Sequence, residues 1–228
     1  HHVELVVANA KQAAFFDRKA FGFDQVAYRG PETGTPDRVS YVMKQSDIWM
    51  ILTTPLRHDD PLNIWLTLHG DGVRDIAFQV DDADAAYNMA IERGAVSVDA
   101  PHDHVDDHGK VRHACVQTYG DTVHSFFSKQ DYAGPFLPLF QAKELKEEDT
   151  GLLVVDHIVG NVEDHQMNHW KEYYENVFGW HQFLSFDDKD ISTEYTALMS
   201  KVMSNGNGRI KFPLNEPAAG KKKSQIEE

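Results

Sequence analysis

The sequence predicts an α+β fold built from repeated βαβββ modules. A strand, a helix and three strands follow one another in residues 2–53, and the same order begins again at residues 73 and 152. Such a recurrence within one chain is the sign of a repeated supersecondary unit. A polar stretch, 141–151, separates the second copy from the third and has the composition of an interdomain linker.

The first module opens with an apolar strand at 2–8. Asn9 can cap a following helix, whose apolar residues recur at helical spacing, and Gly22 marks its end. Further strands are predicted at 23–28, 38–44 and 48–53. A helix at 61–70 would connect this module to the next.

The second module starts with the alternating strand 73–80. Asp82 can cap a helix with an apolar stripe, and Gly94 ends it. The predicted strands that follow are 96–98, 111–118 and 122–128.

The third module has an apolar strand at 152–162 and a helix that stops at Gly179. Its remaining strands are predicted at 180–186, 195–203 and 209–213. The predicted domains are therefore 1–140, with two modules, and 152–228, with a third. One module leaves its sheet half covered, so modules should pair and enclose a cavity on a shared concave sheet.

Composition restricts the function classes. The 228 residues include 22 basic and 36 acidic side chains, for a net charge of −14, which disfavours binding to nucleic acid. No apolar run approaches the roughly 18 residues of a membrane helix. The single cysteine, Cys115, excludes an internal disulfide and favours a reducing, cytoplasmic setting.

The carboxy-terminal residues suggest that more chain follows. Ser224 and Glu227 have the spacing of a capping box, which announces a helix just where the sequence stops. We therefore expect a fourth module beyond residue 228 and a longer protein.

Histidines are the most conspicuous candidates for chemistry. A dense group lies at His102, His104, His108 and His113, with aspartates between them. A divalent metal site is conceivable there. The turn residues Pro101 and Gly109 favour a solvated hairpin loop instead.

His157 differs because it falls within an apolar strand, where its ring must be hydrogen-bonded or bound to metal. Taken alone, it reads as a satisfied core histidine. Ser200, Asn215 and Gln225, taken singly, read as a strand residue, a turn residue and a helix start. No nucleophile elbow, P-loop or dinucleotide fingerprint is visible.

Several segments resemble the 4-hydroxyphenylpyruvate dioxygenase family of the vicinal oxygen chelate superfamily, whose modules are βαβββ units. The matching segments are VVANAKQAAFF at 6–16, VAYRGPE at 26–32, TYG at 118–120, VDHIVGNV at 155–162, YTALMSKVMS at 195–204, KFPLNEPA at 211–218 and KKKSQIEE at 221–228. The resemblance covers essentially the whole chain.

The resemblance implies one Fe(II) held by two histidines and one glutamate in the carboxy-terminal domain, a donor set that leaves positions open for substrate and oxygen. His157 matches the first ligand, and the other two are expected beyond Glu228. The family's amino-terminal domain carries no metal, so His2 is not assigned. Ser200, Asn215 and Gln225 match polar residues of the substrate pocket, and Pro213 matches part of its wall.

The implied reaction belongs to tyrosine catabolism. 4-Hydroxyphenylpyruvate and O2 would give homogentisate and CO2, with ring hydroxylation and side-chain migration. The alternatives are a 4-hydroxymandelate synthase and a non-catalytic small-molecule binding protein of the same fold. The family favours a homo-oligomer, without nucleic-acid or membrane partners. With one iron ligand of three, the 228-residue segment alone is expected to be inactive.

Overall fold

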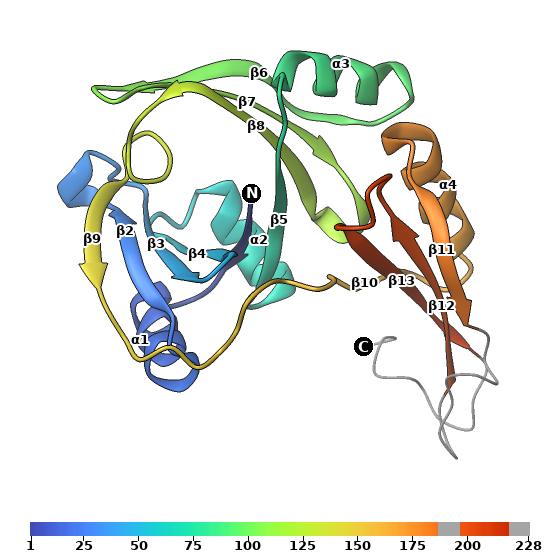
Figure 1. The fold of residues 1–228 in the computed structure, drawn as a ribbon, viewed down its shortest axis with the longest axis horizontal. Coiled ribbons are helices and arrows are strands. Elements are labelled where there is room, and N and C mark those ends of the chain that lie inside the picture. The colour runs from blue at the N-terminus through green and yellow to red at the C-terminus, as the bar shows by residue number, and fades with distance from the viewer. Residues whose placement is uncertain (187–196, 219–228) are drawn as a thin grey trace. The chain divides into compact units, whose positions relative to one another are not determined.

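The computed structural model describes residues 1–186 and 197–218 (Figure 1). The chain divides into two compact units at Val154 and Val155, and residues Met89–Ala95 are grouped with the second unit. No helix in the described ranges combines the length and the apolar character needed to cross a membrane.

The first unit contains a nine-stranded sheet in the order β6-β7-β8-β5-β1-β4-β3-β2-β9. Its strands are β1 (His2–Val6), β2 (Asp24–Arg29), β3 (Arg38–Gln45), β4 (Ile48–Pro55), β5 (Gly72–Gln79), β6 (Ser97–Asp106), β7 (Gly109–Gln117), β8 (Val123–Tyr132) and β9 (Gln141–Leu145). Its helices are α1 (Ala10–Phe21), α2 (Pro61–His69) and α3 (Ala83–Glu92), with 3-10 turns at Pro31–Thr33 and Tyr119–Asp121.

The two modules pair as expected. β1 runs antiparallel to β5, and each module also pairs its first strand with its last in parallel, β1 with β4 and β5 with β8. The combined sheet curls, so that its two halves, β2–β4 and β6–β8, face each other (Figure 1). α1 packs on β3 and β4, where Ala14, Met43 and Leu52 are buried together. The predicted α+β architecture is confirmed.

Local chemistry sets the helix ends that the sequence predicted. The Asn9 side chain accepts a hydrogen bond from the Gln12 N–H at 3.0 Å, and that of Asp82 accepts one from the Ala85 N–H at 3.0 Å. Each bond satisfies a backbone donor that the first helical turn leaves free. Gly22 ends α1 in the left-handed conformation at φ 71°, which glycine adopts without steric cost.

The segment predicted as a linker, 141–151, begins with a strand. β9 pairs antiparallel with β2 and covers an edge of the sheet (Figure 1). Beyond it, the Glu147 carboxylate pairs with Arg18 and Lys19, and the Thr150 hydroxyl donates to the Phe21 carbonyl at 2.5 Å. The polar composition that suggested a linker is that of an exposed outer strand.

The histidine-rich segment is a strand pair and not a long loop. β6 extends to Asp106 and β7 begins at Gly109, so only a two-residue turn separates them. Pro101 is tolerated because β6 is the outermost strand on its side of the sheet. The predicted strand 96–98 is therefore much too short, and His102, His104 and His113 lie within strands.

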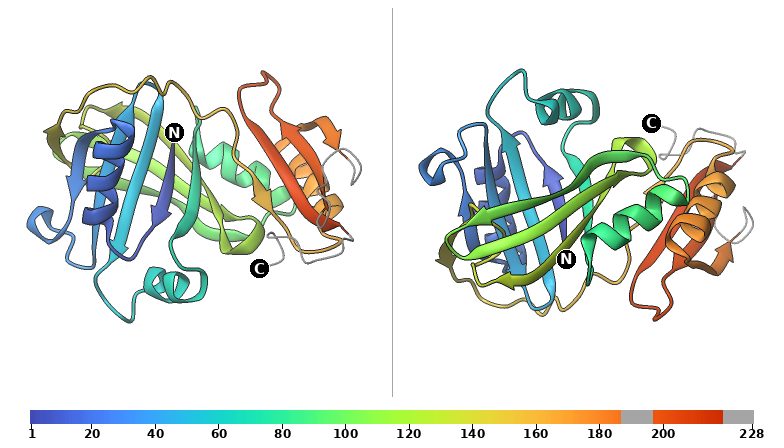
Figure 2. Two further views of the ribbon diagram at one scale, coloured as in Figure 1. Left: turned by 90° about the horizontal axis from the view of Figure 1, so that it is seen from below. Right: turned by 90° about the horizontal axis from the view of Figure 1, so that it is seen from above.

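The second unit is a four-stranded sheet covered on one face by α4 (Met167–Phe178) (Figure 2). The strand order is β10-β13-β12-β11, with β10 (Gly160–Asn161), β11 (His181–Phe186), β12 (Ala197–Ser204) and β13 (Lys211–Ala218). Aromatic packing attaches the helix, since the Tyr174 ring stacks on Trp180 at 5.0 Å and meets Phe212 edge-on at 5.7 Å. Gly179 ends α4 in the left-handed conformation.

The predicted strand 152–162 is wrong over most of its length. Only Gly160 and Asn161 form strand pairs, with Leu214 and Asn215 of β13. Among the described strands of this unit, β10 lies at the edge of the sheet and pairs only with β13. With a partner on one side only, the rest of the segment is not held in a strand. Gln225 and the capping box at Ser224 fall outside the residues that the structure describes.

Candidate functional site

Three of the four pocket residues implied by the resemblance share one face of the second unit's sheet. Ser200 of β12 is directly opposite Asn215 of β13, and Val202 is opposite Pro213. Side chains alternate between the faces of a strand, and Phe212 and Leu214 are buried on the α4 side. Ser200, Pro213 and Asn215 therefore lie on the face away from α4.

His157 lies beside β13, three residues before the first paired residue of β10. The neighbouring Ile158 N–H donates to the Lys211 carbonyl at 3.2 Å, which continues the contact between the two segments. The side chain of His157 is 51% exposed. The prediction of a histidine enclosed within an apolar strand is therefore wrong, because the segment lies at a sheet edge.

Asp156 is the partner of His157, although side chains of adjacent residues in a regular strand would point to opposite faces. Its Oδ2 lies 2.7 Å from His157 Nδ1, and its Oδ1 lies 3.1 Å from Lys211 Nζ. The hydrogen bonds from His157 and Lys211 lower the pKa of the Asp156 carboxyl. Alternation fails here because residues 156 and 157 are outside a regular strand.

This pair suits a metal ligand. When Nδ1–H donates to a carboxylate, Nε2 keeps the lone pair that binds a cation, and such a carboxylate fixes the orientation of the ring. His157 thus fits one position of a metal centre. Within the described residues, three potential ligands converge only at His102, His104 and His113, which belong to the first unit.

The first unit has a cavity of about 310 Å³ that sequence reasoning did not locate. Side chains from both modules line it, among them His2, Glu4, Arg29, Arg38, Arg74, Asp75, Asp99, His104, His113 and Ser125. The paired modules do form a cavity in this unit, but it is partly open to solvent and not enclosed as expected. The sequence did carry a signal for this cavity. Glu4 on β1 and Asp75 on β5 are charged residues at inward-facing strand positions, and a charge on a covered face needs a partner or a function.

Asp75 is the most perturbed acid of this cavity. It is buried, and its carboxylate accepts a hydrogen bond from the Ser125 N–H at 3.0 Å. Burial raises the pKa of Asp75 to about 7, and the negative charge of Glu4 adds to the effect. Burial also lowers the pKa of His2 well below its ordinary value, so that its ring is neutral.

Asp75→Asn is expected to remove a pH dependence of stability. Between about pH 4 and pH 7 the folded protein retains a proton on Asp75 that the unfolded chain has released, so the free energy of unfolding falls as pH rises through this window. The asparagine variant should lack this decrease, which amounts to at most about 4 kcal/mol. Urea denaturation at pH 5 and pH 8 measures it, with the exposed Asp107→Asn as control. Equal pH dependence in the wild type and Asp75→Asn would contradict the assignment.

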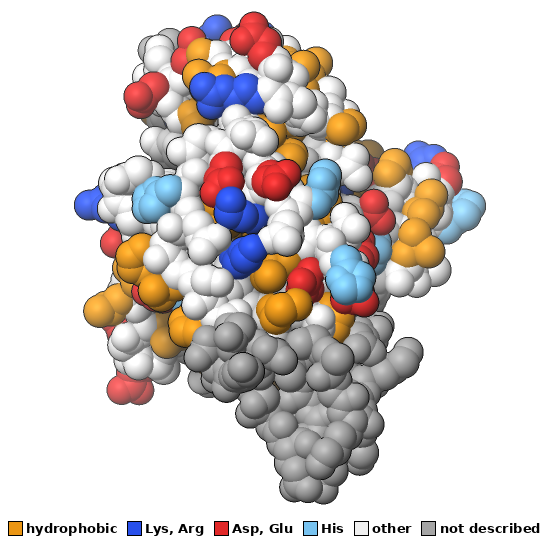
Figure 3. Space-filling view, turned by 90° about the vertical axis from the view of Figure 1, so that its right-hand side faces the viewer, with side chains coloured by type: hydrophobic (Ala, Val, Ile, Leu, Met, Phe, Trp, Pro, Cys, Tyr) orange, Lys and Arg blue, Asp and Glu red, His pale blue; other side chains and the backbone are white. Residues whose placement is uncertain are grey.

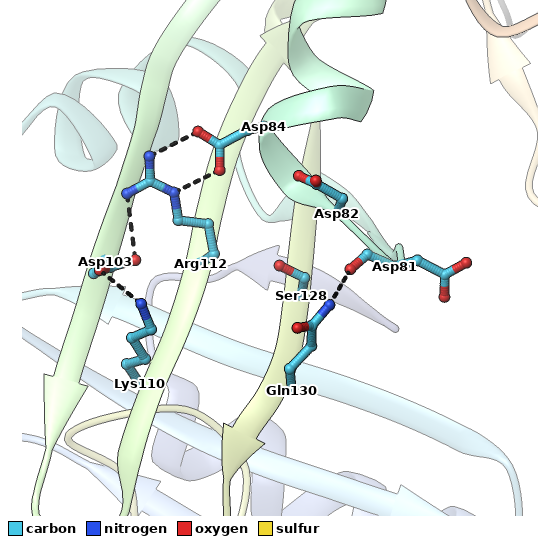
Figure 4. A pocket seen from close by; sticks show the side chains of 8 residues that line it. All are labelled: Asp81, Asp82, Asp84, Asp103, Lys110, Arg112, Ser128 and Gln130. Carbon is cyan, nitrogen blue, oxygen red and sulfur yellow. Dashed lines mark hydrogen bonds and ion pairs between the residues drawn. The ribbon is translucent and has the colours of Figure 1, made fainter.

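A second pocket of about 350 Å³ lies on the surface of the first unit, between α3 and strands β6–β8 (Figure 4). Arg112 reaches both oxygens of Asp84 at 2.7 Å and contacts Asp103 at 3.3 Å, while Lys110 contacts Asp103 at 3.4 Å. The hydrogen bond from Arg112 lowers the pKa of Asp84. Both cations are paired with carboxylates, so this pocket is best explained as a salt-bridge network joining α3 to the sheet.

Acidic and basic side chains are interspersed on the face drawn in Figure 3. Neither charge sign dominates the part of this surface that the structure describes.

Comparisons with known proteins agree with the architecture. Residues 1–123 match the model of the Glyoxalase/Bleomycin resistance protein/Dioxygenase superfamily. The chain is 43% identical to a 4-hydroxyphenylpyruvate dioxygenase of Aspergillus fumigatus, over the whole chain and 62% of that relative. It is 44% identical to one of Xenopus tropicalis, over the whole chain and 60% of that relative. The chain thus spans about 60% of the length of these curated relatives.

A solved structure is also similar. A variant of 4-hydroxymandelate synthase from Streptomyces coelicolor matches with a TM-score of 0.83 and 27% identity, over 99% of this chain and 64% of that one. The resemblance read from the motifs and the vicinal oxygen chelate fold are both confirmed. The residue assignments of the site remain predictions.

Proposed function

The chain belongs to the Glyoxalase/Bleomycin resistance protein/Dioxygenase superfamily, and on this premise we propose that the protein is an Fe(II)-dependent 4-hydroxyphenylpyruvate dioxygenase. The observation that carries the proposal is identity of 40–44% to proteins of that name over the whole chain. The shared sheet face of Ser200, Pro213 and Asn215 supports it, because these residues match the family's pocket.

The proposed reaction converts 4-hydroxyphenylpyruvate and O2 into homogentisate and CO2. Bound Fe(II) would supply the oxidation chemistry that this reaction of a 2-oxo acid with O2 needs. One oxygen atom of O2 enters the new carboxylate and the other enters the ring. The protein's part is to hold the metal, orient the ring and exclude water.

His157 would be one iron ligand, through Nε2. The proton on Nδ1 is held by Asp156 at 2.7 Å, so the ring presents its lone pair outward. Lys211 balances the charge of Asp156 at 3.1 Å and keeps this carboxyl ionised. The second histidine and the glutamate that the family requires are not assigned to described residues.

Ser200 and Asn215 would hold the phenol end of the substrate. The Ser200 side chain is buried on its strand, and Asn215 is its direct neighbour across the sheet. A hydroxyl and an amide offer both donors and acceptors, as a phenolic OH requires. Pro213, two residues before Asn215 on the same face, would add an apolar wall. Gln225, the fourth residue implied by the resemblance, also belongs to this proposal.

Asn215→Ala is expected to raise KM by about tenfold, which corresponds to the loss of one hydrogen bond worth about 1.4 kcal/mol. Steady-state kinetics with 4-hydroxyphenylpyruvate measures this. Asn168→Ala is the matched control, because Asn168 lies on α4 and binds Lys201 on the other side of the sheet. Unchanged kinetics of Asn215→Ala would remove Asn215 from the pocket.

Product identity decides between the two oxygenase activities. Homogentisate and 4-hydroxymandelate are isomers, so chromatography and fragmentation against both standards are needed, using the protein at its natural full length with Fe(II) and O2. Homogentisate supports the proposal. 4-Hydroxymandelate would favour the synthase, and substrate binding without turnover would favour a binding protein.

We also propose a cytoplasmic, homo-oligomeric protein. Cys115, the single cysteine, is buried as a free thiol, and burial raises its pKa to about 12. A thiol of this kind is unreactive and suits a reducing compartment.

A further inference from the structure

Strand geometry brings three imidazoles of the first unit together. His102 and His104 are two residues apart on β6 and therefore point to the same face. His113 of β7 is the direct cross-strand partner of His102. His104 and His113 are diagonal neighbours across this strand pair, within reach of long side chains.

The ring nitrogens converge closely. His104 Nε2 lies 3.1 Å from His102 Nε2 and 3.3 Å from His113 Nδ1. All three atoms lie within 4.8 Å of one another. For a tetrahedral cation with metal–nitrogen bonds of about 2.0–2.1 Å, neighbouring ligand atoms are about 3.3 Å apart. The two distances from His104 therefore match those between neighbouring ligands of one small cation.

Two of these rings have their other nitrogen occupied. His102 Nδ1 lies 3.0 Å from the Ala100 carbonyl, to which it can only donate. His113 Nε2 lies 3.2 Å from the Ser125 hydroxyl. Donation by these two nitrogens leaves lone pairs on His102 Nε2 and His113 Nδ1, both facing His104. A neutral His104 has one ring proton, which cannot donate well to both His102 Nε2 and His113 Nδ1. A cation would instead accept a lone pair from each of the three nitrogens.

We propose that His102 Nε2, His104 Nε2 and His113 Nδ1 form a binding site for a divalent cation of the zinc class. Three imidazoles are a donor set that zinc uses when a fourth position stays open for water. His104 and His113 both line the 310 Å³ cavity, which gives that position access to small molecules. Asp99 also lines the cavity, and its carboxylate lies 3.7 Å from His113 Nδ1.

This site is separate from the iron site proposed above. It uses strands β6 and β7 of the first unit, whereas His157 belongs to the second unit. The assignment therefore stands or falls independently of the dioxygenase activity.

Cation titration tests the site in the metal-free protein. Zn²⁺ binding is followed by calorimetry, and Co²⁺ serves as a probe because tetrahedral Co²⁺ has intense visible absorption. We expect one such cation per chain, with affinity lowered at least tenfold in His104→Ala. His108→Ala, in the turn of the same strand pair, is the matched control and should bind as the wild type does.

Two further comparisons make the result decisive. The site should persist in His157→Ala, which separates it from the iron site. His102→Gln, at a partly exposed side chain, should weaken binding as His104→Ala does, while circular dichroism shows both variants folded. Absence of the tetrahedral Co²⁺ spectrum in the wild type, or equal binding by His104→Ala and His108→Ala, would overturn the proposal.

Discussion

His157→Ala is expected to lower homogentisate formation by at least about 100-fold and to reduce the iron content of the full-length protein. Loss of a group that only orients a metal ligand commonly costs 10–100-fold, so loss of the ligand itself should cost more. Iron analysis and turnover are measured on the same preparations. The expectation rests on the lone pair that Nε2 keeps when the Nδ1 proton of the same ring is held by Asp156.

His169→Ala is the control, because this histidine lies on α4 and packs edge-on against Trp170. It should retain iron and activity. Circular dichroism should show both variants folded, since His157 is half exposed and contributes little packing. Full iron occupancy in His157→Ala would refute its role as a ligand.

Phe212→Ala is expected to destabilise the second unit by about 3–5 kcal/mol, the range for removing a large aromatic ring from a packed core. The Phe212 side chain is 2% exposed and meets Trp180 at 5.1 Å, between the sheet and α4. Native-state hydrogen exchange of the β12 and β13 amides measures the change where it arises.

The control is Phe183→Ala on β11, where the ring is 54% exposed. A surface substitution of this kind should change the free energy by less than about 1 kcal/mol. If both variants lost the same stability, the aromatic cluster would not be what holds α4 on the sheet.

Features that depend on neighbouring residues were predictable from the sequence. The helix starts at Asn9 and Asp82 and the helix ends at Gly22 and Gly179 follow from capping chemistry within one turn. The modules follow from apolar periodicity, and their pairing follows from the need to cover an open sheet.

Features that depend on residues distant in the sequence could not be predicted. The length of β6 depends on its pairing with β7, and β9 forms because β2 offers an edge. A polar composition predicted a loop and a linker at these places, since exposed outer strands and loops have similar compositions. The approach of His113 to His102 likewise requires the register of the sheet.

The residues of the candidate site likewise depend on contacts that the sequence does not show. The sequence predicted a turn at Asn215, and its position opposite Ser200 follows only from the register of β12 and β13. The Asp156–His157 contact was missed because the segment departs from a strand just there. The buried acid Asp75 shows in the sequence only as a charge within an alternating strand, and its raised pKa comes from burial by a curled sheet.

Isotope labelling tests the central claim most directly. The full-length protein is incubated with Fe(II), 4-hydroxyphenylpyruvate and ¹⁸O2, and the product is analysed by chromatography and fragmentation. The proposed function predicts homogentisate with one labelled oxygen in the carboxylate and one in the ring. A product labelled at the benzylic carbon, or no labelled product from protein with bound iron, would contradict it.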